Sequence, residues 1–64
     1  MEAFVERMID EQKKLEEKID KIFICINSET YKNLSEENQV LLYLQYLYMV
    51  SYNNILIRRI KINK

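Results

Sequence analysis

Two kinds of residue near the C-terminal end of the chain could take part in chemistry. Arg58, Arg59 and Lys61 form a short run of bases, and Tyr48 and Tyr52 precede them at helical spacing. Guanidinium and ammonium groups hold phosphate oxygens, and a tyrosine ring offers a face on which a nucleobase stacks. Together, these five residues predict a site for an anionic ligand that contains a base.

The same residues also have a purely structural interpretation. Tyrosines at helical spacing commonly fill a core or an interface, with their hydroxyls at its edge. Bases at the end of a helix interact favourably with the C-terminal dipole. They could also pair with the acids of the first half, because residues 1–37 hold all ten acids and residues 38–64 hold none. The sequence leaves both interpretations open.

No set of residues in the chain suggests catalysis. There is no histidine, no glycine and one cysteine, Cys25. Adjacent acids such as Asp10 and Glu11 diverge around a helix, so they do not form an acid–base pair. A single cysteine forms no disulfide within the chain and supplies no structural zinc site. We therefore expect a binding protein that is not an enzyme and that carries no cofactor and no metal.

The elements that position these residues are predicted to be two long helices. The chain lacks glycine and proline, which argues against the tight turns of a β-sheet protein. Apolar residues recur at intervals of four and three from Met1 to Ile26, with Gln12 as a polar interruption. Such spacing is typical of a helix seam, and we expect Gln12 to be buried there and to set the register.

The predicted fold class is all-α, an antiparallel two-helix hairpin in a single domain covering residues 1–64. We expect helices over residues 2–26 and 36–62, joined by a loop over residues 27–35 that contains a one-turn helix. Asn27 should end the first helix in the left-handed conformation. Ser28 should cap the one-turn helix, and Ser35 should cap the second long helix.

The second helix is apolar over more of its surface than one neighbour can cover. A folded chain of 64 residues also buries too little apolar surface on its own to be very stable. We therefore expect copies of the chain to self-associate into a helical bundle. The residues predicted to make this contact are Leu41, Leu44, Leu47, Tyr48, Met49 and Ile55.

Composition also bears on the cellular location of the protein and on the classes of partner that it can bind. No segment reaches about 18 uninterrupted apolar residues, so we expect no membrane partner. The acidic N-terminus does not resemble a signal peptide, and a free cysteine suits a reducing cytoplasm. Four bases in the second half are few for a duplex nucleic-acid binder, which usually presents a larger basic surface.

Three segments of the chain resemble a family of short tailed-phage proteins, first labelled from a crAss-like phage gene product. Residues 7–22 read RMIDEQKKLEEKIDKI and are similar to its opening helix. Residues 27–49 read NSETYKNLSEENQVLLYLQYLYM, and residues 51–60 read SYNNILIRRI. They resemble the family's loop with its second-helix entry and its closing segment. The resemblance implies a phage or prophage origin and a helical hairpin.

These observations lead to one expected function and two alternatives. The expected function is counter-defence in the cytoplasm of a bacterial host. The protein would act as a homo-oligomer that sequesters a nucleotide immune signal. One alternative is a protein-binding inhibitor of a host defence effector such as a CRISPR nuclease. The other is a structural or assembly accessory of the phage.

Overall fold

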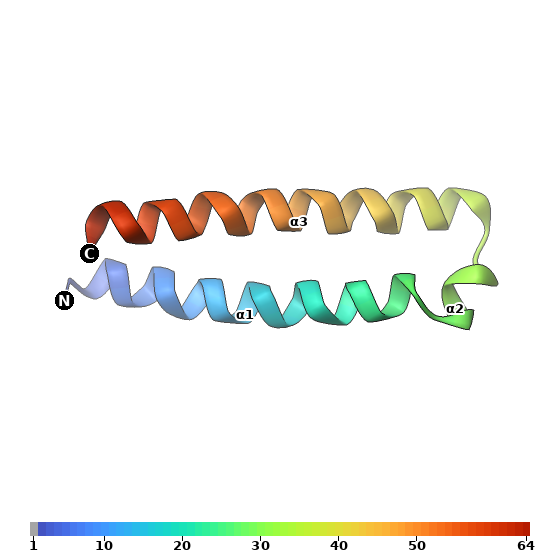
Figure 1. Cartoon of the computed structure of the whole chain (residues 1–64), viewed down its shortest axis with the longest axis horizontal. Coiled ribbons are helices and arrows are strands. Elements are labelled where there is room, and N and C mark those ends of the chain that lie inside the picture. The colour runs from blue at the N-terminus through green and yellow to red at the C-terminus, as the bar shows by residue number, and fades with distance from the viewer. Residues whose placement is uncertain (1) are drawn as a thin grey trace.

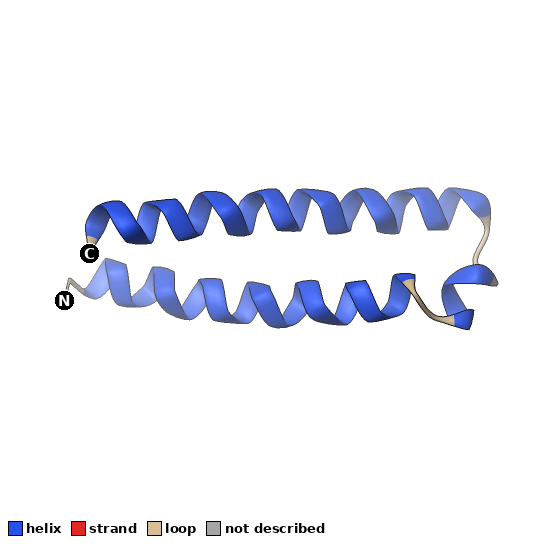
Figure 2. Ribbon diagram, in the orientation of Figure 1, coloured by secondary structure: helices blue, strands red, loops and turns tan. Residues whose placement is uncertain are grey.

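The computed structural model describes residues 2–64 and consists of three helices. These are α1 (Ala3–Ile26), α2 (Glu29–Lys32) and α3 (Glu36–Asn63). The two long helices lie side by side and antiparallel, with α2 at the end of the rod away from both termini (Figure 1). Within residues 2–64, the non-helical parts are Glu2, Lys64 and two short connections (Figure 2). The predicted all-α hairpin is confirmed.

A small core holds α1 against α3. It consists of Val5, Met8 and Leu15 on α1 and Leu56 on α3. Val5 and Leu56 are almost completely buried, with exposed fractions of 0% and 1%. All three core residues of α1 belong to the predicted seam, whose first position, Met1, lies outside the described residues.

Gln12 lies in the interface between the long helices, as the sequence predicts, although it is half-buried. Its Nε2 donates to Oδ1 of Asn53 on α3 at 3.1 Å and to Oε2 of Glu16 at 3.1 Å. The first of these bonds joins two positions that match in only one register of the hairpin. The structure therefore supports a register role for Gln12.

Both predicted serine caps are present in the connection. Ser28 Oγ accepts from the Tyr31 backbone N–H at 3.4 Å and begins α2, and Ser35 Oγ accepts from the Asn38 N–H at 3.2 Å and begins α3. A cap of this kind satisfies one of the free N–H groups in the first turn of a helix. Local sequence signals therefore set where both helices begin.

The prediction for Asn27 is wrong. Its backbone has φ −94° and ψ 12°, and no residue among 2–64 has a positive φ. The Asn27 Nδ2 instead donates to the Phe23 carbonyl at 2.8 Å, and Ser28 Oγ donates to the Cys25 carbonyl at 2.6 Å. Because side chains satisfy these carbonyls, α1 ends without a left-handed residue.

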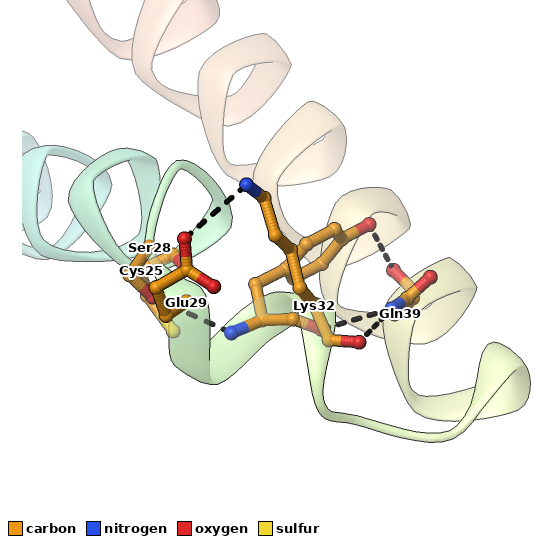
Figure 3. A network of polar contacts seen from close by, with 6 residues as sticks. Cys25, Ser28, Glu29, Lys32 and Gln39 are labelled. Atoms are coloured by element: carbon orange, nitrogen blue, oxygen red, sulfur yellow. Dashed lines mark hydrogen bonds and ion pairs between the residues drawn. The ribbon is translucent and has the colours of Figure 1, made fainter.

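Gln39 joins α2 to α3, a role that sequence reasoning missed. Its Nε2 donates to the Tyr31 carbonyl at 2.9 Å, and its backbone carbonyl accepts from the Tyr31 hydroxyl at 3.0 Å (Figure 3). Weaker contacts reach the carbonyls of Lys32 at 3.4 Å and Leu34 at 3.3 Å. The Gln39 side chain thus supplies hydrogen bonds to backbone carbonyls at the end of α2 and holds α2 beside the first turns of α3.

By length and composition alone, α3 could cross a membrane. It has 28 residues, its most apolar window has a mean hydropathy of 1.2, and 6% of that window is buried. However, α1 packs along α3 and exposes many charged side chains, such as Lys14 and Lys18. A charge at the centre of a bilayer costs about 3 kcal/mol on insertion scales. Insertion of the hairpin as a unit would therefore carry the charged side chains of α1 into the bilayer at that cost.

Candidate functional site

Most of α3 is apolar and uncovered. Leu56 is its one buried residue, since α1 shields a single side of the helix. The predicted surplus of apolar surface is therefore present. Of the residues predicted to self-associate, Met49 is half-buried and packs against the core, and the others are exposed. The exposed large apolar residues of α3 are Val40, Leu41, Tyr43, Leu44, Leu47, Tyr48, Tyr52, Ile55, Ile57 and Ile62.

Two shallow grooves meet at Tyr52. The first, here called the apolar groove, has a volume of about 610 Å³ and is formed by α3 alone. The second, the charged groove, has a volume of about 380 Å³ and lies between α1 and α3. The apolar groove is lined by Leu41, Leu44, Gln45, Tyr48, Met49 and Tyr52. The charged groove is lined by Arg7, Asp10, Glu11, Lys14, Leu15, Lys18 and Tyr52.

The charged groove is made by a stripe of α1 that faces the same side as Tyr52. Arg7, Lys14 and Lys18 are spaced by seven and four residues, which places them on one face of the helix at separations of about 10 and 6 Å along its axis. Lys14 Nζ lies 3.1 Å from Asp10 Oδ2, in an ion pair whose side chains are 70% and 66% exposed. The groove thus holds three bases and two acids beside one tyrosine.

The four tyrosines of α3 divide into two pairs. The Tyr46 ring packs near Phe23, with 6.1 Å between centroids, and near Tyr43, at 6.3 Å. Tyr48 and Tyr52 line the apolar groove instead, with exposed fractions of 72% and 44%. Tyr48 and Tyr52 are therefore exposed at the surface of a groove, and their binding role stays a prediction.

The three bases predicted to join these tyrosines project to different sides of α3. Arg58, Arg59 and Lys61 are all exposed. Because a helix turns about 100° per residue, Arg59 and Lys61 project about 160° apart. Lys61 lines a separate groove of about 300 Å³ with Ile9, Gln12 and neighbouring residues. Arg59 follows Tyr52 by seven residues and lies on the same side of α3 as the two tyrosines, whereas Lys61 lies on another side. Within one chain the three bases therefore do not converge as a set on the two tyrosines.

The predicted pairing of the C-terminal bases with acids of the first half is absent among residues 2–64, although Lys61 lies in the last turn of α3, where the helix dipole favours a base. Among residues 2–64 there are two ion pairs, Asp10–Lys14 and Glu29–Lys32, and each lies within one helix. The acids of α1 therefore do not neutralise Arg58, Arg59 or Lys61. These bases remain open to an anion or to an acid on another molecule.

The part of the chain that the structure describes holds no group of three or more histidine, cysteine or acidic side chains placed to bind a metal. Cys25 is a free, half-buried thiol near the end of α1. Its neighbour in the turn, Ser28, bonds to the backbone and not to the sulfur. The grooves around Tyr52 are therefore the features that suggest a function.

A family model with the description Sequestin matches residues 2–62, which covers all three helices up to the last residues of α3. No curated protein and no solved structure matches the chain. The matched region includes every residue that lines the two grooves. The family name is compatible with sequestration of a ligand.

Proposed function

Because the chain belongs to the Sequestin family, we propose that it captures a small anionic nucleotide and withholds that nucleotide from its receptor. The observation that carries this proposal is the position of Tyr52 beside Arg7, Lys14 and Lys18 in the charged groove. The protein would act as a non-enzymatic homo-oligomer encoded by a phage. Its target in the cytoplasm of the bacterial host would be a nucleotide immune signal.

The bases of the charged groove supply the phosphate contacts in this proposal. Arg7 and Lys18 have no ion-pair partner among the described residues, so both are available to a ligand. Lys14 would exchange Asp10 for a phosphate. An exposed ion pair is worth about 0.2–1 kcal/mol, so this exchange costs little. Charge-assisted hydrogen bonds to phosphate are stronger than neutral ones, which favours the exchange.

Tyr52 and the two acids supply the remaining contacts. Tyr52 is 44% exposed and lines the groove, so a nucleobase can stack on its ring, which is worth about 1–3 kcal/mol per base. Asp10 and Glu11 lie in the same groove, and ionised carboxylates accept hydrogen bonds from ribose hydroxyls. The groove therefore offers partners for all three parts of a nucleotide.

Isothermal titration against cyclic dinucleotides, cyclic trinucleotides and ADP-ribose derivatives tests the proposal. At least one of these compounds should bind, and Tyr52→Leu should weaken its binding at least tenfold. Tyr43→Leu is the matched control, because Tyr43 is 47% exposed on α3 but lines neither groove. Absence of binding to every compound would overturn the proposed function.

A protein-binding inhibitor of a host defence effector is the second candidate function. The observation that favours it is the apolar outer side of α3, where Val40 and Leu47 are 55% and 42% exposed and face away from α1. A tagged copy would then retain a host protein from lysate, and Val40→Glu would release that protein. Recovery of the chain alone would count against this function.

A further inference from the structure

One stripe of α3 has the same spacing when read from either end. We call it the palindromic seam, and it runs for about 33 Å along the helix. Its members follow one another at intervals of four, three, four, four, three and four, so they stay on one side of α3. All are exposed. The palindromic seam consists of Glu37, Leu41, Leu44, Tyr48, Tyr52, Ile55 and Arg59.

We propose that the palindromic seam packs against the same seam of a second copy, antiparallel, with a two-fold axis at Tyr48. This inference deepens the proposed function, because it rests on the homo-oligomer named there. The symmetric spacing then places each apolar residue of the seam against an apolar residue of the partner, and each charged residue against one of opposite charge. Tyr48 meets the partner's Tyr48, and Leu44 meets the partner's Tyr52. Leu41 meets the partner's Ile55, and Glu37 meets the partner's Arg59.

Charge at the ends of the seam selects the antiparallel arrangement. Glu37 is in the first turn of α3, and Arg59 is near its last turn. Neither residue belongs to an ion pair within residues 2–64. Antiparallel packing brings each acid to a base at both ends of the contact. Parallel packing would place acid on acid and base on base, which is repulsive and costs affinity.

The seam also exposes apolar surface on the scale of a small specific interface. Its five apolar members have exposed fractions from 39% for Leu44 to 72% for Tyr48. Taking about 200 Å² for a fully exposed side chain of this size, they present roughly 550 Å² per copy. With the charged ends added, two copies approach the lower limit of about 1,200 Å² for a specific interface.

The opposite flank of α3 is less suited to a second copy. There, the stripe that includes Leu47 and Ile57 is interrupted by the amide of Asn54. Its Tyr43 ring already packs against Tyr46 within the same chain. A polar group left without a partner in a contact costs about 1–3 kcal/mol. The palindromic seam has no such interruption between Glu37 and Arg59.

This contact would also complete the ligand site. Tyr52 lines both the apolar and the charged groove. The partner's Leu44 would cover Tyr52 from the side of the apolar groove and leave its other side open to the charged groove. The second copy thereby becomes a wall of the site that we assign to the nucleotide. Each dimer would carry two such sites, related by the axis at Tyr48.

Cysteine cross-linking without nucleotide tests the seam separately from the ligand. In a Cys25→Ser background, Tyr48→Cys places two thiols across the axis, so a mild oxidant should convert most of the protein to a covalent dimer. Leu47→Cys in the same background is the matched control, because Leu47 is the adjacent exposed residue but faces away from the seam. Equal or greater cross-linking of the Leu47→Cys variant would overturn the proposal, as would a wild-type protein that is monomeric by light scattering.

Charge reversal tests the register. Glu37→Arg or Arg59→Glu alone should weaken the dimer at least tenfold by light scattering across a dilution series. The double variant Glu37→Arg/Arg59→Glu should recover most of that loss, because both ion pairs then form in the reversed sense. Single variants that dimerise as well as the wild type would overturn the register. If the dimer forms but no nucleotide binds in titration, the seam stands and the proposed function fails.

Discussion

Gln12 Nε2 lies 3.1 Å from Asn53 Oδ1, and within residues 2–64 this is the side-chain hydrogen bond that crosses from α1 to α3. The buried core between the two helices is apolar. Apolar contacts tolerate small shifts, whereas a hydrogen bond of this kind forms only when its two groups face each other. The pair therefore fixes how far one helix is displaced along the other.

The first prediction concerns this pair. Gln12→Leu should lower the free energy of unfolding by about 1–3 kcal/mol, because Asn53 is left half-buried without its partner. The double variant Gln12→Leu/Asn53→Leu should recover most of that loss, since both polar groups are gone. Urea unfolding at one fixed protein concentration measures both changes. Asn54→Leu, at an exposed position, should change stability by less than about 0.5 kcal/mol.

The second prediction concerns the core. Leu56→Ala should cost about 2–5 kcal/mol, because Leu56 is 1% exposed and packs within a core of few residues. For a chain of 64 residues this is a large part of the total stability, so we expect loss of most helical circular dichroism at 25 °C. Ile62→Ala is the control, since Ile62 is 80% exposed. Equal effects of the two changes would contradict the packing described above.

The third prediction concerns the junction between α2 and α3. Gln39→Ala removes the amide that donates to the Tyr31 carbonyl at 2.9 Å, and it leaves the end of α2 without that partner. Amide hydrogen exchange at Asn33 and Leu34 should then accelerate about tenfold, while exchange in the middle of α1 stays unchanged. Gln45→Ala, at an exposed glutamine outside the junction, should leave these amides unaffected.

The fourth prediction separates the charged groove from the C-terminal bases. Lys18→Ala should weaken nucleotide binding by about ten- to a hundredfold, because one charge-assisted hydrogen bond contributes about 1.5–3 kcal/mol. Lys61→Ala should have little effect, since Lys61 lines a different groove. Titration of both variants at two salt concentrations provides the measurement. A larger effect of Lys61→Ala than of Lys18→Ala would indicate that the nucleotide binds at the C-terminal bases and not in the charged groove.

Much of the fold could be predicted from the sequence because its signals are local. Apolar spacing identifies the face of α1 that holds Val5, Met8 and Leu15, and serines at two positions begin α2 and α3. The end of α1 could not be predicted in the same way. Asparagine can accept a left-handed conformation or cap with its amide, and the nearby Phe23 carbonyl favours the second outcome. The role of Gln39 depends on where α2 lies in space. The residues next to Gln39 in the sequence do not indicate that position.

The candidate site was harder to predict, because neighbours in sequence diverge around a helix. Arg58, Arg59 and Lys61 form a run in sequence, yet α3 sends them in different directions. Arg7, Lys14 and Lys18 are scattered in a charged segment that also suits a solvated face. Their spacing of seven and four residues was the available signal. It becomes informative only once the hairpin brings Tyr52 to the same side.

The start of α1 and the end of α3 lie at the same end of the rod (Figure 1). A force applied between the two ends therefore peels α3 from α1, and the layer around Ile60 opens before the layers behind it. When the helices are peeled apart, the layers of contact break one after another, so each resists the force alone. When two helices are pulled past each other in shear, all layers resist the force together. Forced unfolding is governed by the unfolding rate. An unfoldase that pulls on either end would meet low mechanical resistance until it reached the turn at α2.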